Sequence, residues 1–217
     1  MRDFPMFTTE NGVGSITLKE VTYKGIAYIK IQSSLLPEAF LQECIDFCKM
    51  AGAEKIYASG HKMLETYPLH NAIWLMSALR ERLQETDAAL FPVTEKTADT
   101  WRSIYNEKMF PISNSSTMTR SDMDTLVQQG GGYFIHRGDE LLGIGIARGE
   151  TVESVIAVKP GAGREVMLAL CGSLHSERVV LEVASTNKRA IKLYENLGFL
   201  RISELSCWYD VLTRKNT

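Results

Sequence analysis

The run LEVASTNKRAIKLYENLGF, residues 181–199, is the stretch that decides how this chain folds. It continues the β-branched segment Val179–Val183, which is typical of a buried strand. Ser185-Thr186-Asn187 supplies turn and N-cap chemistry, and apolar residues then recur at helical spacing as far as Leu197. Gly198 is a C-cap candidate, because glycine adopts the left-handed conformation at little cost. The stretch therefore predicts a strand that leads directly into a short helix.

Composition is that of an ordinary soluble globular protein. The chain has 217 residues, of which 45% are hydrophobic and 23% charged, and its net charge is −2. This charge argues against bulk attraction to nucleic acid or to an anionic membrane, so we expect neither as a partner. We see no apolar run near the roughly 20 residues of a membrane span and no signal-peptide pattern. The sequence therefore predicts a cytoplasmic protein.

The four cysteines show no CxxC pattern. Cys44 and Cys48 are four residues apart on an expected helix, so they share one face of it. We expect all four to be free thiols that pack as small hydrophobic groups. No cluster of His or Cys completes a metal site, so we expect no metal.

Residues 1–87 predict a small α/β layer. The expected elements are, in order, a β-hairpin at 14–32, a helix at 37–50, a strand at 55–59 and a helix at 74–84. The hairpin is predicted from apolar alternation around Lys24-Gly25. The second helix is predicted from the apolar residues between Trp74 and Leu83.

Residues 88–217 predict a longer series of the order β–α–α–β–β–β–α–β–α–β. The expected elements are a strand at 89–93, helices at 94–109 and 120–129, strands at 133–137, 141–148 and 152–158, a helix at 164–174, the strand and helix described above, and closing antiparallel strands within 201–212. The predicted fold class is α+β: a mixed, mostly antiparallel central sheet flanked by helices and preceded by a smaller α/β half-domain.

This order and the 181–199 stretch resemble the GNAT superfamily of acyl-CoA-dependent N-acetyltransferases. In the family's final motif an Asn starts the last helix, and an Ala, a Leu-Tyr pair and a Gly-Phe follow. Here these are Asn187, Ala190, Leu193-Tyr194 and Gly198-Phe199. The form is most similar to the branch that acetylates protein N-termini. The resemblance covers residues 88–217 and implies a GNAT N-acetyltransferase domain there.

Residues 1–87 do not resemble the start of a standard member. Two interpretations stay open: a degenerate copy of the second half of the same fold, arranged in tandem, or an unrelated α/β extension. Both predict the same coarse order of elements. The expected domains are therefore an N-terminal α/β region, 1–87, and a GNAT domain, 88–217.

The resemblance implies an acyltransferase that moves an acetyl group from acetyl-CoA to a primary amine of a small molecule or peptide by direct attack. The amine must be neutral to attack, so a base is needed. Tyr194 is the implied acid for the CoA thiolate, and Glu182 is the implied base, acting through water. Glu153 is a rival base. The structural alternatives are a core aromatic for Tyr194 and a solvent-facing strand residue for Glu182.

A second set of residues is implied for the cofactor. The cofactor-binding residues that the resemblance implies are Ile156, Ala157, Val158, Gly161, Ala162, Gly163, Arg164 and Asn187. The loop after the expected 152–158 strand keeps two glycines at G-x-G spacing, where backbone amides and a helix start can hold a pyrophosphate. It is shorter than the family's loop, and Lys159 and Arg164 could offset this with charge. A tight turn without a ligand is the alternative, as a pure N-cap role is for Asn187.

The competing function is a non-catalytic module that uses the GNAT fold to bind acyl-CoA or another metabolite, or to contact a partner. The shortened loop favours this module, and the intact 187–194 segment favours the enzyme. By analogy with the family, Tyr105 and Phe110 could line the pocket of the amine acceptor. The resemblance also allows a homodimer.

Overall fold

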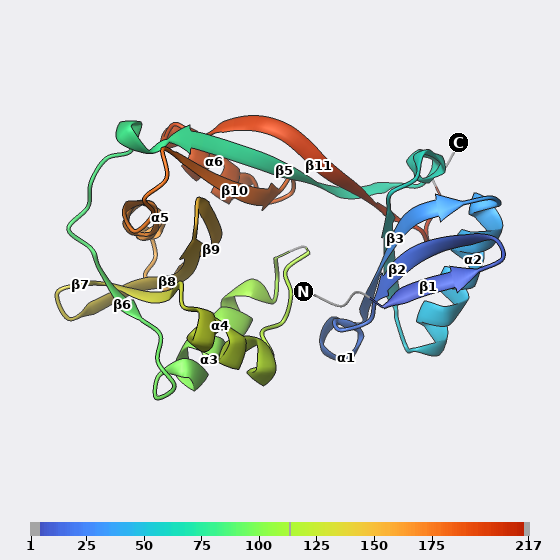
Figure 1. Ribbon diagram of the computed structural model, residues 1–217, viewed down its shortest axis with the longest axis horizontal. Helices are drawn as coiled ribbons and strands as arrows, with labels where there is room; N and C mark the ends of the chain where they lie inside the picture. The colour runs from blue at the N-terminus through green and yellow to red at the C-terminus, as the bar shows by residue number, and fades with distance from the viewer. Residues whose placement is uncertain (1–4, 113, 215–217) are drawn as a thin grey trace. The chain divides into compact units, whose positions relative to one another are not determined.

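A computed structural model describes residues 5–112 and 114–214, and the chain divides into two compact units (Figure 1). The N-terminal unit comprises Met1–Ile73 and Glu204–Thr217, and the C-terminal unit comprises Trp74–Ser203. The division falls inside two long strands, so the N-terminal unit includes a strand segment that is distant from it in sequence, whereas the C-terminal unit is one continuous range. The predicted boundary, between residues 87 and 88, separates the N-terminal α/β region from the expected GNAT domain, and it stays a prediction.

The N-terminal unit begins with an antiparallel meander of β1 (Met6–Thr9), β2 (Gly12–Thr17) and β3 (Ile26–Ser34), with the short helix α1 (Val21–Lys24) between β2 and β3. Helix α2 (Pro37–Met50) then leads to β4 (Lys55–Ser59), which runs parallel to β3. The 3-10 helix η1 (Lys62–Thr66) precedes β5 (Leu69–Leu79), and the end of β11 (Leu200–Asp210) pairs with β4. The predicted first helix, the short strand and the antiparallel pairing within 14–32 are confirmed. The tight turn predicted at Lys24-Gly25 is wrong, because β2 ends at Thr17 and α1 occupies Val21–Lys24.

One stripe of α2 closes the core of the N-terminal unit. Phe40, Leu41, Cys44, Ile45 and Cys48 recur at helical spacing and are buried against the apolar face of β2, β3 and β4. Each such side chain contributes about 1.5–3 kcal/mol when fully buried. The sheet and α2 therefore form a core that belongs to this unit alone.

The C-terminal unit follows the predicted order of elements. Its elements are β6 (Ala89–Pro92), α3 (Ala98–Met109), α4 (Arg120–Gln129), β7 (Gly132–Arg137), β8 (Glu140–Arg148), β9 (Thr151–Ala157), α5 (Gly163–Gly172), β10 (Arg178–Ala184), α6 (Lys188–Asn196) and then β11. The strand order is β5-β10-β9-β8-β7-β6, and β9 and β10 are parallel. The predicted mixed, mostly antiparallel sheet flanked by helices is confirmed.

Helices cover both faces of this second sheet. One face packs against α5 and α6, with Leu181 and Val183 of β10 among the buried residues. The other packs against α3 and α4, with Ile144 and Ile146 of β8 beneath Trp101. Because alternate residues of a strand point to opposite faces, β8 contributes to both layers: Ile144 and Ile146 face α3 and α4, whereas Gly143 and Gly145 face α5.

Two predicted elements are wrong. The segment 74–84 is not a helix: it is the end of β5 followed by the short 3-10 helix η2 (Arg80–Arg82). Trp74, Met76 and Ala78 all pack into the core of the C-terminal unit, which is the period of a strand. The closing segment is one continuous strand, β11, rather than two antiparallel strands, and it contains no glycine, proline or asparagine that would favour a turn.

Candidate functional site

The sheet of the C-terminal unit opens between β9 and β10. These parallel strands pair at a single position in the described residues, Val180 with Thr151. There the amide of Val180 donates to the carbonyl of Glu150 over 2.9 Å. Beyond this point each strand continues toward its carboxyl end without a further partner in the other. We call the space between them the β9–β10 opening.

Backbone alternation decides which groups of β9 face this opening. The amide of Val158 donates to the carbonyl of Leu142 over 2.9 Å, and Ala157 lies opposite Gly143 in the ladder with β8. Hydrogen-bonded and non-bonded pairs alternate in antiparallel strands, so the amide of Ile156 is on the β8 side. The N–H of Ala157 is on the other side. Of the three expected backbone positions on this strand, Ala157 is therefore the one directed toward the opening.

The start of α5 offers hydrogen-bond donors next to the side of β9 that faces the opening. Gly161 has φ 88°, and the amide of Ala162 closes a turn on the carbonyl of Lys159 over 3.2 Å. Ala162 is the N-cap and has no capping side chain. Within residues 5–112 and 114–214, the amides of Gly163, Arg164 and Glu165 have no acceptor. These are the unsatisfied donors of a helix N-terminus, which suit an anion such as a phosphate.

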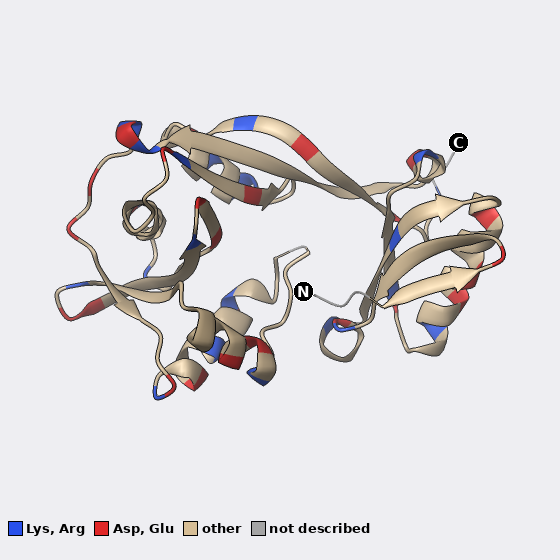
Figure 2. Ribbon diagram, in the orientation of Figure 1, with Lys and Arg blue, Asp and Glu red and all other residues tan. Residues whose placement is uncertain are grey.

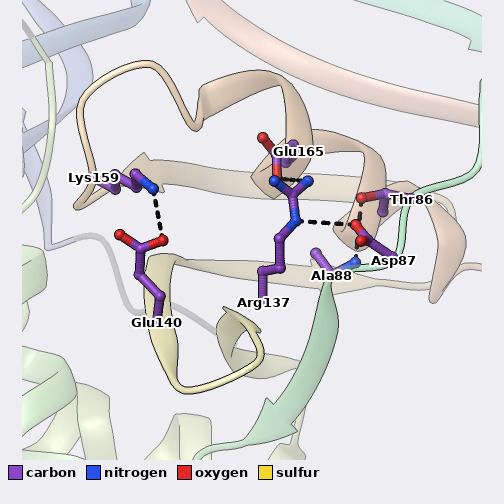
Figure 3. Close-up of polar contacts among 7 residues, drawn as sticks. All are labelled: Thr86, Asp87, Ala88, Arg137, Glu140, Lys159 and Glu165. Carbon is purple, nitrogen blue, oxygen red and sulfur yellow. Dashed lines mark hydrogen bonds and ion pairs between the residues drawn. The ribbon is translucent and has the colours of Figure 1, made fainter.

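The cations of this loop are already engaged, as Figure 3 shows for Lys159. The ammonium of Lys159 lies 2.6 Å from a carboxylate oxygen of Glu140. The guanidinium of Arg164 donates to the side-chain oxygen of Gln84 over 2.5 Å. Exposed pairs of this kind contribute roughly 0–1 kcal/mol, so an arriving phosphate could displace them at low cost.

A third basic residue, which the sequence did not single out, lies at the same helix start. Arg137, from the end of β7, is ion-paired with Glu165 and donates through Nε to Asp87 over 3.1 Å. Figure 3 shows its guanidinium between the two carboxylates. It therefore offsets the charge of Glu165 in the first turn of α5. Arg137 lies at the end of a strand that is far from this loop in sequence, so no sequence pattern indicated that it would lie near the loop.

Asn187 is the N-cap of α6. Its side-chain oxygen accepts a hydrogen bond from the amide of Ala190 over 3.2 Å. This is the structural role that the N-cap chemistry predicts. Gly198, just beyond the helix, has φ 93°, as expected for a left-handed C-cap residue.

Tyr194 lies in the core between α5 and α6. Its side chain is 8% exposed, and its ring lies 6.0 Å from that of Phe199. Burial, followed by the nearby Cys171, raises the pKa of Tyr194 to about 12. The phenol therefore stays protonated at every physiological pH and can act as a hydrogen-bond donor.

Glu182 and Tyr194 belong to opposite faces of β10. Leu181 and Val183, the neighbours of Glu182 in the strand, pack into the same core as Tyr194. Alternation therefore directs the exposed Glu182 to the other face. A group lying in the β9–β10 opening would have the carboxylate on one side and the phenol on the other.

Ser154 is a further candidate that sequence reasoning missed. It is 7% exposed, and in the described part of the chain its hydroxyl has no hydrogen-bond partner. It lies opposite Ile146, which faces α3 and α4. A serine inside the apolar run of β9 was the available signal, because an unpaired buried hydroxyl costs about 1–3 kcal/mol.

The rival base Glu153, the acceptor-pocket candidates Tyr105 and Phe110, and His136 of β7 belong to the sheet and the helix layer. Glu153 is ion-paired with Arg148 over 3.1 Å. The ring of His136 contacts Phe91 edge to face, with 5.4 Å between centroids. Tyr105 is buried and stacks on Trp101, whereas Phe110 is 60% exposed. These contacts lie within the sheet and the helix layer, so we assign none of the four residues to the β9–β10 opening.

Metal-ligating side chains are scattered in the described part of the chain. Among residues 5–112 and 114–214, His, Cys, Asp and Glu form no group of three or more that could hold a metal ion. All four cysteines are free thiols, as predicted. No helix in the described ranges is long and apolar enough to cross a membrane.

Solved structures resemble the chain along nearly its whole length. A functionally unknown conserved protein from Staphylococcus epidermidis aligns with a TM-score of 0.59 at 11% identity, covering 97% of this chain and 95% of that one. A putative acetyltransferase from Pyrococcus horikoshii aligns with a TM-score of 0.58 at 12% identity, covering 95% and 72%. A GCN5-related N-acetyltransferase from Sphaerobacter thermophilus aligns with a TM-score of 0.56 at 10% identity, covering 94% and 78%.

At such identities the likeness shows the fold, and the chain has the GNAT fold that its sequence resembles. No protein-family model matches the sequence. A search of the curated proteins finds no match either.

Proposed function

We propose that this GNAT-fold chain is an acyltransferase that moves an acetyl group from acetyl-CoA to a primary amine of a small molecule or peptide. The observation that carries the proposal is the β9–β10 opening, which lies beside a helix start whose amides have no acceptor among the described residues. The pantetheine arm would lie along the free edge of β9, and the pyrophosphate would bind at the start of α5. Similarity of fold alone does not assign an activity, so the proposal rests on the geometry of the β9–β10 opening.

Each step of the transfer has a candidate group. The neutral amine attacks the thioester carbon, and its proton passes through water to Glu182. The developing oxyanion accepts a hydrogen bond from the N–H of Ala157. The carbon–sulfur bond then breaks, and CoA leaves as a thiolate. Asn187, which is the N-cap of α6, is proposed also to contact the CoA arm.

Tyr194 stabilises the leaving thiolate by donating a hydrogen bond rather than by giving up its proton. A thiol titrates near 8.5, whereas burial raises the pKa of Tyr194 to about 12. Complete transfer from this phenol to a thiolate would therefore be uphill by roughly 5 kcal/mol. The role of acid that the resemblance implies becomes that of a donor that keeps its proton.

Calorimetry of the full chain with acetyl-CoA is the direct test. We expect saturable binding in the micromolar range. The absence of binding at high micromolar acetyl-CoA would contradict the proposal. Thiol release measured over peptides, polyamines and amino sugars would then identify the acceptor.

A matched pair of variants tests the base. Glu182→Gln should lower turnover about 100-fold, because it removes the proton acceptor. Glu153→Gln changes a carboxylate on the neighbouring strand that is held by Arg148, and it should leave turnover nearly unchanged. The reverse ranking would transfer the role to Glu153.

The alternative function is a non-catalytic module. It is favoured by the ion pair of Lys159 and the hydrogen bond of Arg164, which occupy the cations of a short loop. This alternative predicts acetyl-CoA binding without thiol release for any amine, or no binding at all.

We also propose that residues 1–87 are a degenerate copy of the second half of this fold, and that 88–217 form the donor-binding domain. The repeated order of elements supports this over an unrelated extension.

A further inference from the structure

A bulge lies in β9 just after its last pair with β10. Two adjacent residues of β8 pair with Val152 and Ser154, so Glu153 between them is an extra residue in β9. Because of the bulge, Val152 and Ser154 face opposite sides of the sheet. Val152 packs with α5 and α6, whereas Ile156, which shares the face of Ser154, packs with α3 and α4.

The bulge also sets the level at which Ser154 lies along the opening. Val180 pairs with Thr151, so Glu182 lies two residues beyond the last pair and on the same face of β10 as Val180. In β9 the extra residue brings Ser154, rather than Glu153, level with Glu182. Both side chains belong to the face that turns away from the core of α5 and α6, one on each side of the β9–β10 opening.

The hydroxyl of Ser154 lies among apolar side chains. The residue is 7% exposed, and in the described part of the chain its Oγ has no hydrogen-bond partner. Its neighbours on this face are Ile144, Ile146 and Ile156. The unmade hydrogen bond costs about 1–3 kcal/mol. Since no such bond holds Oγ in its present position, rotation about χ1 between staggered positions can direct it to the side of β9 that faces the opening.

The proposed transfer requires a group in this place, and the inference rests on that transfer. The proton of the amine passes through a water molecule to Glu182. A water that is held in position needs at least two polar partners. Glu182 is one of them, on the β10 side. On the β9 side Ile156 is apolar, and Ser154 offers a hydroxyl at the level of the carboxylate.

We propose that Ser154 is a positioning residue for the transfer: its hydroxyl accepts a hydrogen bond from the water that carries the proton to Glu182. The water takes one proton from the amine and gives one of its own to the carboxylate. Its other hydrogen stays bonded to Ser154, which keeps its own proton throughout. Ser154 therefore acts through the water and Glu182 rather than on the acetyl group.

Two variants of equal shape isolate the hydroxyl. Threonine and valine differ in that group alone, so Ser154→Thr keeps the hydrogen-bond acceptor and Ser154→Val removes it. Thiol release from acetyl-CoA should give a kcat about tenfold lower for Ser154→Val and Ser154→Ala, whereas Ser154→Thr should keep most of the kcat. The KM for acetyl-CoA should not change, because the residue does not contact the donor.

Ser77 of β5 offers a matched control. It is 6% exposed, and among the described residues its hydroxyl has no partner either. Beyond the end of β5, the amide of Arg80 donates over 2.9 Å to the carbonyl of Glu177, which precedes β10. The two strands are thus antiparallel, and Ser77 lies opposite Val180, where β9 and β10 are still paired. Ser77→Ala should therefore leave the kcat unchanged.

Coupling to Glu182 separates positioning from packing. In a Glu182→Gln background the water has lost its proton acceptor, so Ser154→Ala should lower the kcat no further. Three results would overturn the assignment: an additional tenfold loss in that background, equal kcat values for Ser154→Thr and Ser154→Val, or an equal loss in Ser77→Ala. Equal thermal midpoints would show that the variants fold.

A crystal structure of the full chain supplies a readout that does not depend on turnover. We expect an ordered water within roughly 3.2 Å of both Oγ of Ser154 and a carboxylate oxygen of Glu182. No water between these two side chains would overturn the inference even if thiol is released. Absence of thiol release with every amine would instead contradict the proposed function. The two failures are therefore separate outcomes.

Discussion

The two units contain the same series of elements but differ at the place where a donor could bind. The first series is β1-β2-α1-β3-α2-β4-η1-β5, and the second is β7-β8-β9-α5-β10-α6-β11, which has no helix at the place of the short α1. In each, three antiparallel strands are followed by a helix and by a strand parallel to the third. Charges of both signs are spread along both units (Figure 2). The two units therefore share the order of elements but not the place where a donor could bind.

The glycines of the second strand repeat as well. Gly12 and Gly14 of β2 face Phe40 of α2, where an added Cβ would lie within 2.8–3.2 Å of its ring. In β8, Gly143 and Gly145 leave room in the same way for Val166 and Leu170 of α5. In both series a G-x-G pair lets a helix pack closely on the sheet.

The difference lies at the parallel strands. β3 and β4 pair over five positions, whereas β9 and β10 pair at one in the described residues. Pro37 stands at the start of α2 and has no N–H to offer, whereas α5 begins with Gly163. A site for the acetyl donor therefore needs two parallel strands that separate, beside a helix start whose amides have no acceptor. The order of elements guarantees neither feature.

The largest expected effect comes from removing the N–H that faces the opening. Ala157→Pro should lower turnover with acetyl-CoA about 100- to 1,000-fold, because it removes the proposed oxyanion donor. It should spare the β8–β9 ladder, since that amide is not on the β8 side. Ile156→Pro, which removes a ladder amide, should instead destabilise the fold. Retained turnover in a folded Ala157→Pro variant would remove Ala157 from the mechanism.

The close helix packing is tested by adding single methyl groups. Gly143→Ala places a Cβ 2.3 Å from the carbonyl oxygen of Ile156, so we expect a loss of about 3 kcal/mol in the free energy of unfolding. Gly14→Ala meets its nearest atom at 2.8 Å and should cost less. Gly172→Ala, which meets nothing within 4 Å, should be neutral or slightly stabilising. Denaturant unfolding measures all three, and equal losses would contradict the packing argument.

The buried phenol should give the C-terminal unit a dependence on alkaline pH. Burial raises the pKa of Tyr194 from about 10 to about 12, so its contribution is fully present below pH 10. It is lost as the pH rises from 10 to 12, by roughly 2–3 kcal/mol. Tyr194→Phe should remove this loss. Tyr57→Phe, a matched change in the N-terminal unit, should remove a smaller one, and unfolding curves from pH 9 to 12 would show whether that ranking holds.

The smallest expected effects concern the two caps. Asn187→Ala should destabilise the chain by about 1 kcal/mol, because the amide of Ala190 loses its acceptor. His61→Ala removes the acceptor of the Met63 amide in the five-residue η1 and should cost only a few tenths of a kcal/mol. Thermal unfolding should rank them in this order. A larger effect at His61 would show that the cap of η1 matters more than its length indicates.

Much of the fold was predictable because local signals agreed with it. The 181–199 stretch folds as predicted, into β10 and α6 with Asn187 as the N-cap. Strand β5 was missed because its apolar residues fit a helix as well as a strand, and only the packing of Trp74, Met76 and Ala78 into one core shows the period of two. Of the expected backbone contacts on β9, the geometry separates Ala157 from Ile156 and Val158, a distinction that pairing partners decide and residue types do not.

The sequence by itself determined the succession of strands and helices from Ala89 to Asn196, the capped helix after β10 and the glycine start of α5, since each depends on the conformational preferences of a few neighbouring residues. Only the tertiary structure decided that β9 and β10 part after a single pair while β3 and β4 remain joined. It also decided that Glu182 and Tyr194 lie on opposite faces of β10. These features depend on hydrogen bonds and packing between residues far apart in the chain, which no local pattern encodes.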